Sequence, residues 1–186
     1  MALRRLPYRS LEALFRRERP REEEPGTRAL IERLSHVKRV GEFSRPEFLE
    51  MCRWKSPRAA PQYRRNRAAR ICQVSRAVLA SRSEERRLDL LTGLRGVSVP
   101  VASAILTLVD PARYGVLDIR VWQLLFALGC VGGRPGGRGF LARDWLDYLA
   151  ILRRQARRLG ISVREVEYTL FHSHRKFQAG LLYGPS

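Results

Sequence analysis

The chain has 186 residues, of which 36 are Lys or Arg and 18 are Asp or Glu, and its formal net charge is +18. Hydrophobic residues make up 45% of the sequence and aromatic residues 9%, which excludes a wholly disordered chain and provides enough apolar side chains for a buried core. No apolar run is long enough to span a bilayer, and the first residues lack the apolar segment of a signal peptide. We therefore expect a cytoplasmic protein without a membrane span, folded as one domain or as two small lobes.

The basic residues are almost all arginine, since Lys38, Lys55 and Lys176 are the only lysines. A guanidinium group presents a planar fork of donors that suits phosphate oxygens. A charge of +18 on so short a chain points to a polyanionic partner, most simply nucleic acid. An arginine bias can also arise from a GC-rich genome, and charged runs often lie on solvated faces, so charge alone leaves both readings open.

The first part of the chain is highly charged. Residues 1–26 contain three prolines and several charged runs, and we expect a loosely held arm with a short helix after Ser10. Thr27 is a favourable N-cap for the next helix, which Gly41 ends. The boundary between the arm and the folded domain, residues 27–186, is therefore expected at this cap.

Two capping boxes mark further helix starts. Ser44 with Glu47, and Ser162 with Glu165, each place a carboxylate three residues after a serine. The first box begins a helix that is followed by a loop over residues 54–61, and the second begins the last helix.

Hydrophobic residues recur at helical spacing through the rest of the chain. The expected segments are a helix over 62–80, one from 84 to about 94, one ending at Asp110, one opened by Asp118, a glycine- and arginine-rich loop over 132–139, and a long helix ended by Gly160. Its apolar stripe is Trp145, Leu149, Leu152, Ala156 and Leu159. No segment alternates as a strand does, so the sequence predicts an all-α fold of about eight helices without an internal repeat.

The segment from Leu94 to Ala102, LRGVSVPVA, joins two of these helices. Its glycine and small residues allow backbone N–H groups to point outward together, and the helix that follows adds the positive end of its dipole. Pro100 suits the first helical turn because its missing N–H costs little there. The pattern predicts a phosphate cradle that holds a nucleic-acid backbone without reading bases.

The stretch from Leu91 to Leu125 resembles the helix-hairpin-helix DNA glycosylase superfamily. That family has a hairpin of the form L-x-G-[VI]-G-x-x-[TV]-A and, further on, a catalytic aspartate in a V/L-D-x-x-V context. The hairpin is matched here by Leu94, Gly96, Val97, Val101 and Ala102. The aspartate is matched by Asp118, 22 residues past Gly96, between Leu117 and Val121.

The resemblance implies two helical lobes with a cleft between them and a hairpin over about 84–109. Double-stranded DNA would lie across the cleft, anchored by the hairpin residues Arg95, Gly96, Val97, Ser98 and Val99. One nucleotide would be flipped into a pocket with Asp118 at its mouth. A monomer associated with the nucleoid is implied as well.

The resemblance also indicates a subclass. Family members that cleave the strand carry a lysine near the start of the second hairpin helix, where this chain has Pro100, so a monofunctional glycosylase without lyase activity is expected. The last cysteine is Cys130, so no iron–sulfur cluster and no other cofactor or metal are expected, although the family hairpin can hold a monovalent cation. Ser98 stands where the family has its second hairpin glycine, and the turn can therefore differ in shape.

An ionised carboxylate stabilises the positive charge that builds on the sugar as an N-glycosidic bond breaks, and it can orient water. Asp118 fits that role, but it is also a favourable N-cap, and both roles are compatible. Trp54, Lys55 and Arg58 combine an aromatic plane with two cations, as a stacking and phosphate site requires. The alternative is a loop anchor with two solvated charges, and Lys55 could also serve as a relocated amine nucleophile.

Other candidates surround Asp118 in the sequence. Tyr114 and Trp122 are candidates for pocket walls, although core positions are their commoner use, and Arg120 could contact DNA or pair with a carboxylate. Asn66 could hydrogen-bond a base, but we expect it to face solvent, and we expect His172 and His174 at the surface. The loop over 132–139 is either a mobile loop that contacts DNA or an unconstrained surface insertion.

The sequence thus favours a base-excision repair glycosylase acting on a damaged or modified base that it does not name. A catalytically inert DNA-binding relative is the alternative, and a structural or RNA-associated protein is a third reading.

Overall fold

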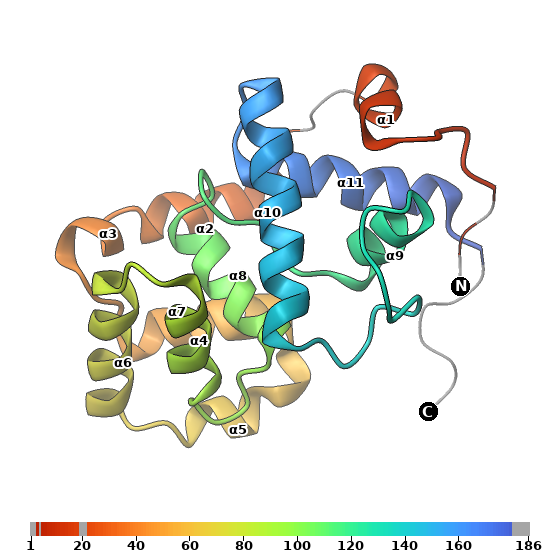
Figure 1. The fold of residues 1–186 in the computed structure, drawn as a ribbon. Helices are drawn as coiled ribbons and strands as arrows, with labels where there is room; N and C mark the ends of the chain where they lie inside the picture. The colour runs from red at the N-terminus through yellow and green to blue at the C-terminus, as the bar shows by residue number, and fades with distance from the viewer. Residues whose placement is uncertain (1–2, 4, 19–21, 180–186) are drawn as a thin grey trace.

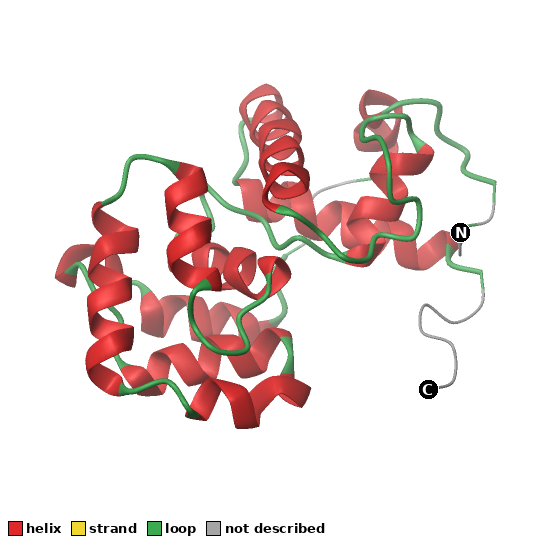
Figure 2. Cartoon of the chain, turned by 60° about the horizontal axis from the view of Figure 1, so that its bottom comes forward, coloured by secondary structure: helices red, strands yellow, loops and turns green. Residues whose placement is uncertain are grey.

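The computed structural model describes residues 3, 5–18 and 22–179 of the chain. These residues form helices joined by loops, with one isolated antiparallel bridge between Leu3 and Gln178 and no strand among them (Figures 1 and 2). The all-α prediction is confirmed. None of the described helices is long and apolar enough to cross a membrane. The two-lobe arrangement with an interlobe cleft stays a prediction.

The elements of the described chain are, in order, α1 (Leu11–Arg17), α2 (Pro25–Leu34), α3 (Val37–Val40), α4 (Arg45–Lys55), the 3-10 turn η1 (Pro57–Ala59), α5 (Ala60–Arg64), α6 (Ala68–Ala80), α7 (Glu84–Thr92), α8 (Val99–Val109), α9 (Ile119–Ala127), α10 (Ala142–Leu159) and α11 (Val163–Phe177). Helices α2 to α8 gather on one side of the molecule, and α9, α11 and α1 lie on the other, with α10 between them (Figure 1).

Helix α8 lies at the centre of the hydrophobic core. Every residue from Val101 to Val109 is buried, and the helix packs against α2, α4, α7 and α10. A helix that is apolar on all sides is stable only when neighbours surround it. The start of α8, which is the second half of the predicted hairpin, is therefore held in a fixed position.

The expected N-cap of α2, Thr27, is wrong by three residues. Glu24 is the N-cap, because its carboxylate accepts hydrogen bonds from the N–H groups of Gly26 and Thr27, each at 2.9 Å, and Pro25 supplies the first-turn φ. Thr27 lies inside the helix, and its hydroxyl accepts a hydrogen bond from Nε1 of Trp54 at 3.0 Å. The domain boundary expected at residues 26 and 27 thus falls within α2.

The helix expected over residues 62–80 is divided in two. Helix α5 ends at Arg64 and α6 begins at Ala68, with Asn66 buried in the break. Hydrophobic spacing does not reveal such a break. Asn can stabilise it, because its side chain bonds to nearby backbone groups in place of helical hydrogen bonds. Helix α4 also continues through Lys55, so the loop expected over 54–61 begins later and contains η1 and the start of α5.

The remaining helix ends largely follow the sequence signals. Both predicted capping boxes form, at Ser44 with Glu47 and at Ser162 with Glu165, and Gly160 ends α10 in the left-handed conformation. The last member of the expected α10 stripe, Leu159, is instead exposed.

The described part of the N-terminal arm packs against the body. Leu11 and Leu14 of α1 are buried, and the ring of Tyr8 meets that of Phe177 edge-on at 5.7 Å. Arg21, which opens the acidic run of the arm, lies outside the described residues.

His174 is buried, and the expectation that it lies at the surface is wrong. Its ring nitrogen Nε2 lies 3.1 Å from Oε1 of Gln123, in the contact between α11 and α9. Burial and the nearby Arg120 charge lower the pKa of His174 to about 4 from an ordinary value of 6.5. His172 is partly exposed.

The burial of His174 predicts a pH dependence of stability. Between about pH 6.5 and pH 4 the unfolded chain binds a proton at this residue that the folded chain does not. The free energy of unfolding should therefore fall by at most about 3 kcal/mol as the pH decreases through this window. Urea unfolding of wild type and His174→Gln across the window measures this share as the difference between the two curves. Parallel curves for wild type and His174→Gln would contradict it.

Candidate active site

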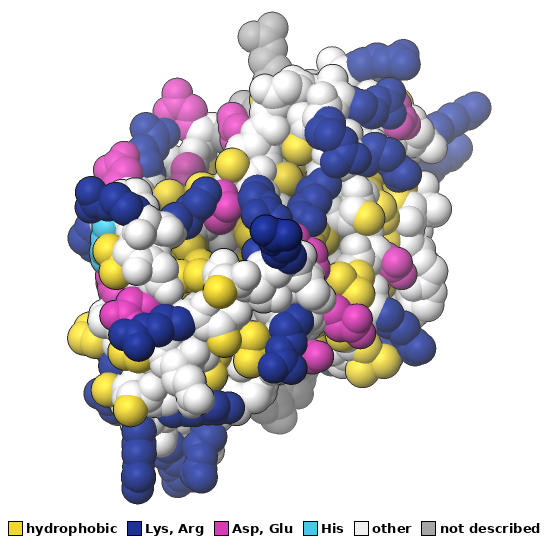
Figure 3. Space-filling view, turned by 60° about the vertical axis from the view of Figure 1, so that its left-hand side comes forward, with side chains coloured by type: hydrophobic (Ala, Val, Ile, Leu, Met, Phe, Trp, Pro, Cys, Tyr) yellow, Lys and Arg dark blue, Asp and Glu magenta, His cyan; other side chains and the backbone are white. Residues whose placement is uncertain are grey.

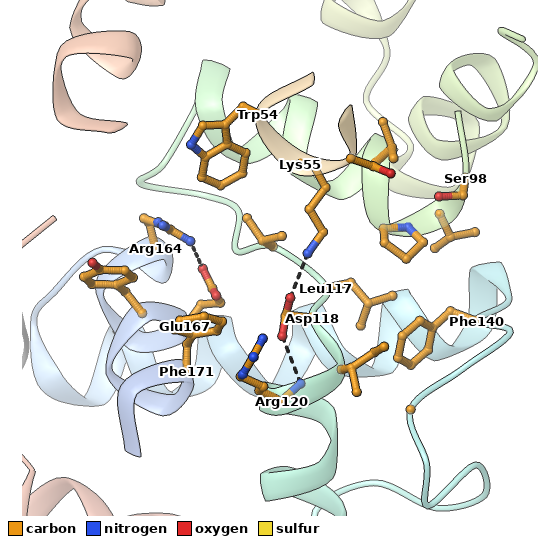
Figure 4. Close-up of a pocket in the computed structure, with 18 of the residues that line it drawn as sticks. Trp54, Lys55, Ser98, Leu117, Asp118, Arg120, Phe140, Arg164, Glu167 and Phe171 are labelled. Carbon is orange, nitrogen blue, oxygen red and sulfur yellow. Dashed lines mark hydrogen bonds and ion pairs between the residues drawn. The ribbon is translucent and has the colours of Figure 1, made fainter. Parts of the chain in front are cut away.

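A cavity of about 780 Å³ opens where α4, α8, α9 and α11 converge (Figure 4). Its aromatic lining consists of Trp54, Phe140, Tyr168 and Phe171. The volume is in the range of small-molecule sites. Charged groups from different elements enter this space, so the cavity combines flat aromatic surfaces with charged side chains of both signs.

Asp118 enters the cavity from the N-terminus of α9. Its Oδ1 accepts the N–H of Arg120 at 2.9 Å, so the predicted N-cap is confirmed. Its Oδ2 accepts a hydrogen bond from Nζ of Lys55 at 2.8 Å (Figure 4). The residue before it is fixed as well, because the N–H of Leu117 donates to Oγ of Ser103 within the core of α8 at 2.9 Å. The carboxylate is thus held in one position and faces the cavity.

The surroundings of Asp118 keep it ionised. Burial raises its pKa, but the charge and hydrogen bond of Lys55 and the N–H of Arg120 outweigh burial, and the pKa lies below its ordinary value. The side chains of Lys55 and Asp118 are 17% and 18% exposed, so solvent screens the pair only in part. A charged carboxylate in a partly desolvated cavity is suited to stabilising a cation.

The approach of Lys55 to Asp118 has no signal in the sequence. Lys55 stands in the last turn of α4, and 63 positions separate the two residues. Trp54 and Arg58 also line the cavity, as predicted for this segment, with Arg58 exposed.

The hairpin loop is held by a clamp that the sequence analysis missed. The side chain of Asn66 accepts the N–H of Arg95 at 2.9 Å and donates to the carbonyl groups of Arg95 and Tyr63, each at 3.0 Å. The expectation that Asn66 faces solvent is therefore wrong. The same three hydrogen bonds stabilise the break between α5 and α6, because they use both the donor and the acceptor of the Asn66 side-chain amide.

Only some of the backbone N–H groups in the hairpin loop are available to an outside acceptor. The N–H of Val97 donates to the carbonyl of Leu94, and that of Arg95 is taken by Asn66. Those of Gly96, Ser98 and Val99 make no hydrogen bond within the described chain. Arg95, Gly96 and Ser98 are exposed, while the side chain of Val97 is buried in the core.

The turn geometry accounts for the residue types of the hairpin. Gly96 has φ of 83°, and a Cβ there would lie 2.8 Å from Cβ of Gln62 and 3.0 Å from the ring of Tyr63. Only glycine fits this position. Ser98 has φ of −86°, which any residue adopts, so no second glycine is required. Its side chain makes no cap hydrogen bond, which leaves the start of α8 open.

A polar wall on α11 completes the cavity. Arg164 pairs with Glu167 on the same helix and with Glu23 before α2, and its guanidinium carbon lies 4.8 Å above the ring of Tyr168 and 5.6 Å from that of Trp54. Burial raises the pKa of Glu167 to about 7, although the charge of Arg164 opposes the shift. This wall can both accept and donate hydrogen bonds.

Neither Arg164 nor Glu167 is predicted as a site residue from the sequence, although the spacing around Glu167 carries a signal. Val163, Glu167 and Phe171 stand four residues apart in the helix that Ser162 begins, so the carboxyl group falls on the apolar stripe. A buried ionisable residue on such a stripe marks a candidate site.

Two predicted pocket residues belong to the core instead. Tyr114 is buried, donates a hydrogen bond to Glu84 and stacks on Trp145 at 6.4 Å. Trp122 is buried and donates from Nε1 to the carbonyl of Arg134 at 3.0 Å. Neither lines the cavity.

Arg120 lines the cavity and lies 5.2 Å above the ring of Phe171. Its Nε donates a hydrogen bond to Oε1 of Gln178 at 3.3 Å. Within the described chain its side chain forms no direct ion pair with a carboxylate, that of Asp118 included.

The glycine- and arginine-rich loop is tied to the site. Trp122 and Gln123 of α9 donate to the carbonyl groups of Arg134 and Gly136, and Arg134 pairs with Asp144 at 3.0 Å. Residues 137–140 line the cavity. The loop is thus a part of the wall and not an unconstrained insertion.

No group of three or more His, Cys, Asp or Glu side chains able to hold a metal ion occurs in the described part of the chain. The absence of a cofactor and the option of a monovalent cation stay predictions. Comparison with known protein families, with curated proteins and with solved structures finds no match to this chain.

The hairpin geometry predicts a graded effect of adding a methyl group at three glycines. Gly93→Ala should leave stability unchanged, because φ is −69° and the nearest contact is 3.4 Å. Gly41→Ala should lower the free energy of unfolding by about 1 kcal/mol, through its positive φ alone. Gly96→Ala adds a steric conflict and should cost about 2 to 4 kcal/mol.

Urea unfolding of the three variants gives this order directly. An equal cost at Gly96 and Gly41 would show that the loop moves freely away from Gln62 and Tyr63, against the tight packing described above.

Proposed function

We propose that this protein is a DNA base-excision repair enzyme, a glycosylase that hydrolyses the N-glycosidic bond of a flipped damaged or modified base. The observation that carries the proposal is the ionised carboxylate of Asp118 in an aromatic-lined cavity. The hairpin loop begins α8, and the same helix holds the residue before Asp118 in place. Three features of the protein support it: the backbone anchor, the pocket and the carboxylate.

The hairpin is suited to phosphate. The N–H groups of Gly96, Ser98 and Val99 lack partners within the described chain and stand at the N-terminus of α8, whose dipole favours an anion. Exposed Arg95 adds a charged donor beside them. Lys and Arg side chains also outnumber acidic ones and are spread over the face in Figure 3, as a sequence-independent DNA contact requires.

The cavity is suited to a base taken out of the stack. Trp54, Tyr168 and Phe171 offer planar surfaces, and Arg164 with Glu167 offers donors and acceptors for its edge. The cavity lies beside the start of α8, since Ser98, Val99 and Pro100 belong to its lining. A strand held at the hairpin would therefore have a nucleotide within reach of the cavity.

Asp118 supplies the chemistry. As the bond to the base breaks, the sugar gains positive charge, and a fixed anion lowers the energy of that state more than the energy of the neutral sugar. The same carboxylate can orient the attacking water. Because Asp118 is an N-cap and is also bonded to Lys55, it needs little reorganisation during the reaction.

One observation favours the alternative, a catalytically inert DNA-binding protein. The ammonium group of Lys55 neutralises the carboxylate of Asp118 in the free protein, so the pair could serve only to join α4 to α9. The two readings differ in whether any base is released.

An excision assay separates them. Duplexes with deaminated, oxidised, alkylated or mismatched bases are incubated with wild type, Asp118→Asn and Asp147→Asn, and abasic sites are revealed by alkali. We expect a base to be released and Asp118→Asn to lower the rate by about 100-fold or more, with duplex affinity nearly unchanged. Asp147, an exposed carboxylate outside the cavity, is the matched control. Full activity of Asp118→Asn would refute the assignment, and binding without any product would favour the inert protein.

The phosphate anchor predicts a steep salt dependence. Duplex affinity should fall as the salt concentration rises, and Arg95→Gln should lower the slope of log affinity against log salt by about 1. Arg39→Gln, at an exposed position on α3, is the control. Affinity independent of salt would argue against DNA binding altogether, and preference for structured RNA over duplex DNA would favour an RNA-associated protein.

A further inference from the structure

Lys55 is the only lysine that lines the cavity among the described residues. Its Nζ lies 2.8 Å from Oδ2 of Asp118 and points toward the centre of the space in Figure 4. The other two lysines lie elsewhere, Lys38 paired with Asp110 and Lys176 with Glu18. One primary amine therefore stands beside the carboxylate that the proposed excision uses.

We propose that Lys55 gives this protein a second activity, the cleavage of DNA strands at abasic sites through a covalent imine between Lys55 and the deoxyribose. The inference rests on the proposed glycosylase function, since an abasic sugar is what base excision leaves behind. The substrate class is the ring-opened aldehyde form of an abasic site in duplex DNA.

The choice of lysine at this position supports a chemical role. The chain uses Arg for 33 of its 36 basic residues, and a guanidinium would serve a structural pair with Asp118 by bidentate hydrogen bonds. A guanidinium stays protonated, whereas an ammonium group can lose a proton and become a nucleophile. Lys55 can therefore act as a nucleophile, which an arginine at this position could not do.

The geometry supplies a proton acceptor for each step. Asp118 takes a proton from the ammonium group of Lys55, and the free amine attacks C1′ of the aldehyde. Asp118 returns the proton as water leaves, which gives a protonated imine. Asp118 then takes a proton from C2′, the electron pair forms the C2′–C3′ double bond, and the C3′–O bond breaks with release of a 5′-phosphate.

Water then adds to C1′, which frees Lys55 as an ammonium group and leaves an unsaturated aldehyde on the other strand end. Asp118 releases its proton to solvent. The water released when the imine forms balances the water consumed when it is hydrolysed, so the reaction needs no net water, no oxidant and no reductant, and it returns both side chains to their starting states.

The route differs from the one expected from the hairpin. That expectation considered only the start of the second hairpin helix, where Pro100 and its neighbours carry no amine. Here the amine comes from the last turn of α4, a segment that reaches the site only through the tertiary fold.

The test uses a duplex with a preformed abasic site, made by enzymatic removal of uracil, so that it does not depend on the base this protein excises. Wild type, Lys55→Gln, Lys55→Arg, Lys38→Gln and Lys176→Gln are incubated with it, with and without borohydride, which reduces an imine to a stable amine link. Strand scission and the covalent complex are measured, and the complex is mapped by peptide mass spectrometry.

We expect scission and trapping by wild type, Lys38→Gln and Lys176→Gln, an adduct on Lys55, and a loss of about 100-fold or more in both Lys55 variants. Lys55→Arg keeps the positive charge beside Asp118, so its fold and duplex affinity are expected to be retained. If both Lys55 variants failed to fold, the position of the adduct in wild type would still decide.

The proposal is overturned by wild type that binds the abasic duplex without cleavage or trapping, by trapping that survives in folded Lys55→Arg, or by an adduct on Lys38, Lys176 or another amine. If the abasic duplex is neither cleaved nor trapped but a base is released in the excision assay, the role of Lys55 is refuted and the proposed glycosylase activity stands. Scission here without any base release supports Lys55 chemistry and removes the proposed excision.

Discussion

The ion pair between Lys55 and Asp118 is the contact on which the site depends. It joins the end of α4 to the start of α9, and both side chains are mostly screened from water. Removal of either partner would leave a charge in a partly desolvated cavity, which costs more than the pair itself contributes. The pair therefore fixes the relative position of two segments from opposite sides of the molecule and, with them, the mouth of the cavity.

Helix α8 links this pair to the predicted DNA anchor. Its start forms the hairpin loop, which Asn66 clamps from the break between α5 and α6. About one turn further on in the same helix, the hydroxyl of Ser103 accepts a hydrogen bond from the N–H of Leu117, one residue before Asp118. Because α8 is buried on all sides, close packing holds it in one position. The same packing therefore sets the distance between the hairpin loop and the carboxylate of Asp118.

The surface carries an excess of arginine, whereas the cavity holds carboxylates and cations in near balance. Its charged lining consists of Glu23, Glu24, Asp118 and Glu167 together with Lys55, Arg58, Arg120, Arg138 and Arg164. A basic exterior favours a phosphate backbone, and carboxylates inside favour a cationic sugar and the donor groups of a base. The N-terminal segment takes part in this arrangement through Glu23 and Glu24, and is thus part of the site.

The sequence by itself determined the local features: the all-α class, the capping boxes at Ser44 and Ser162, the cap at Asp118 and the loop that begins α8. These depend on residues within one or two turns of each other. Only the tertiary structure decided that Lys55 meets Asp118, that Asn66 holds Arg95, and that Tyr114 and Trp122 lie in the core. Such contacts join segments far apart in the chain, and hydrophobic periodicity gives the buried face of each helix but not the neighbour that covers it.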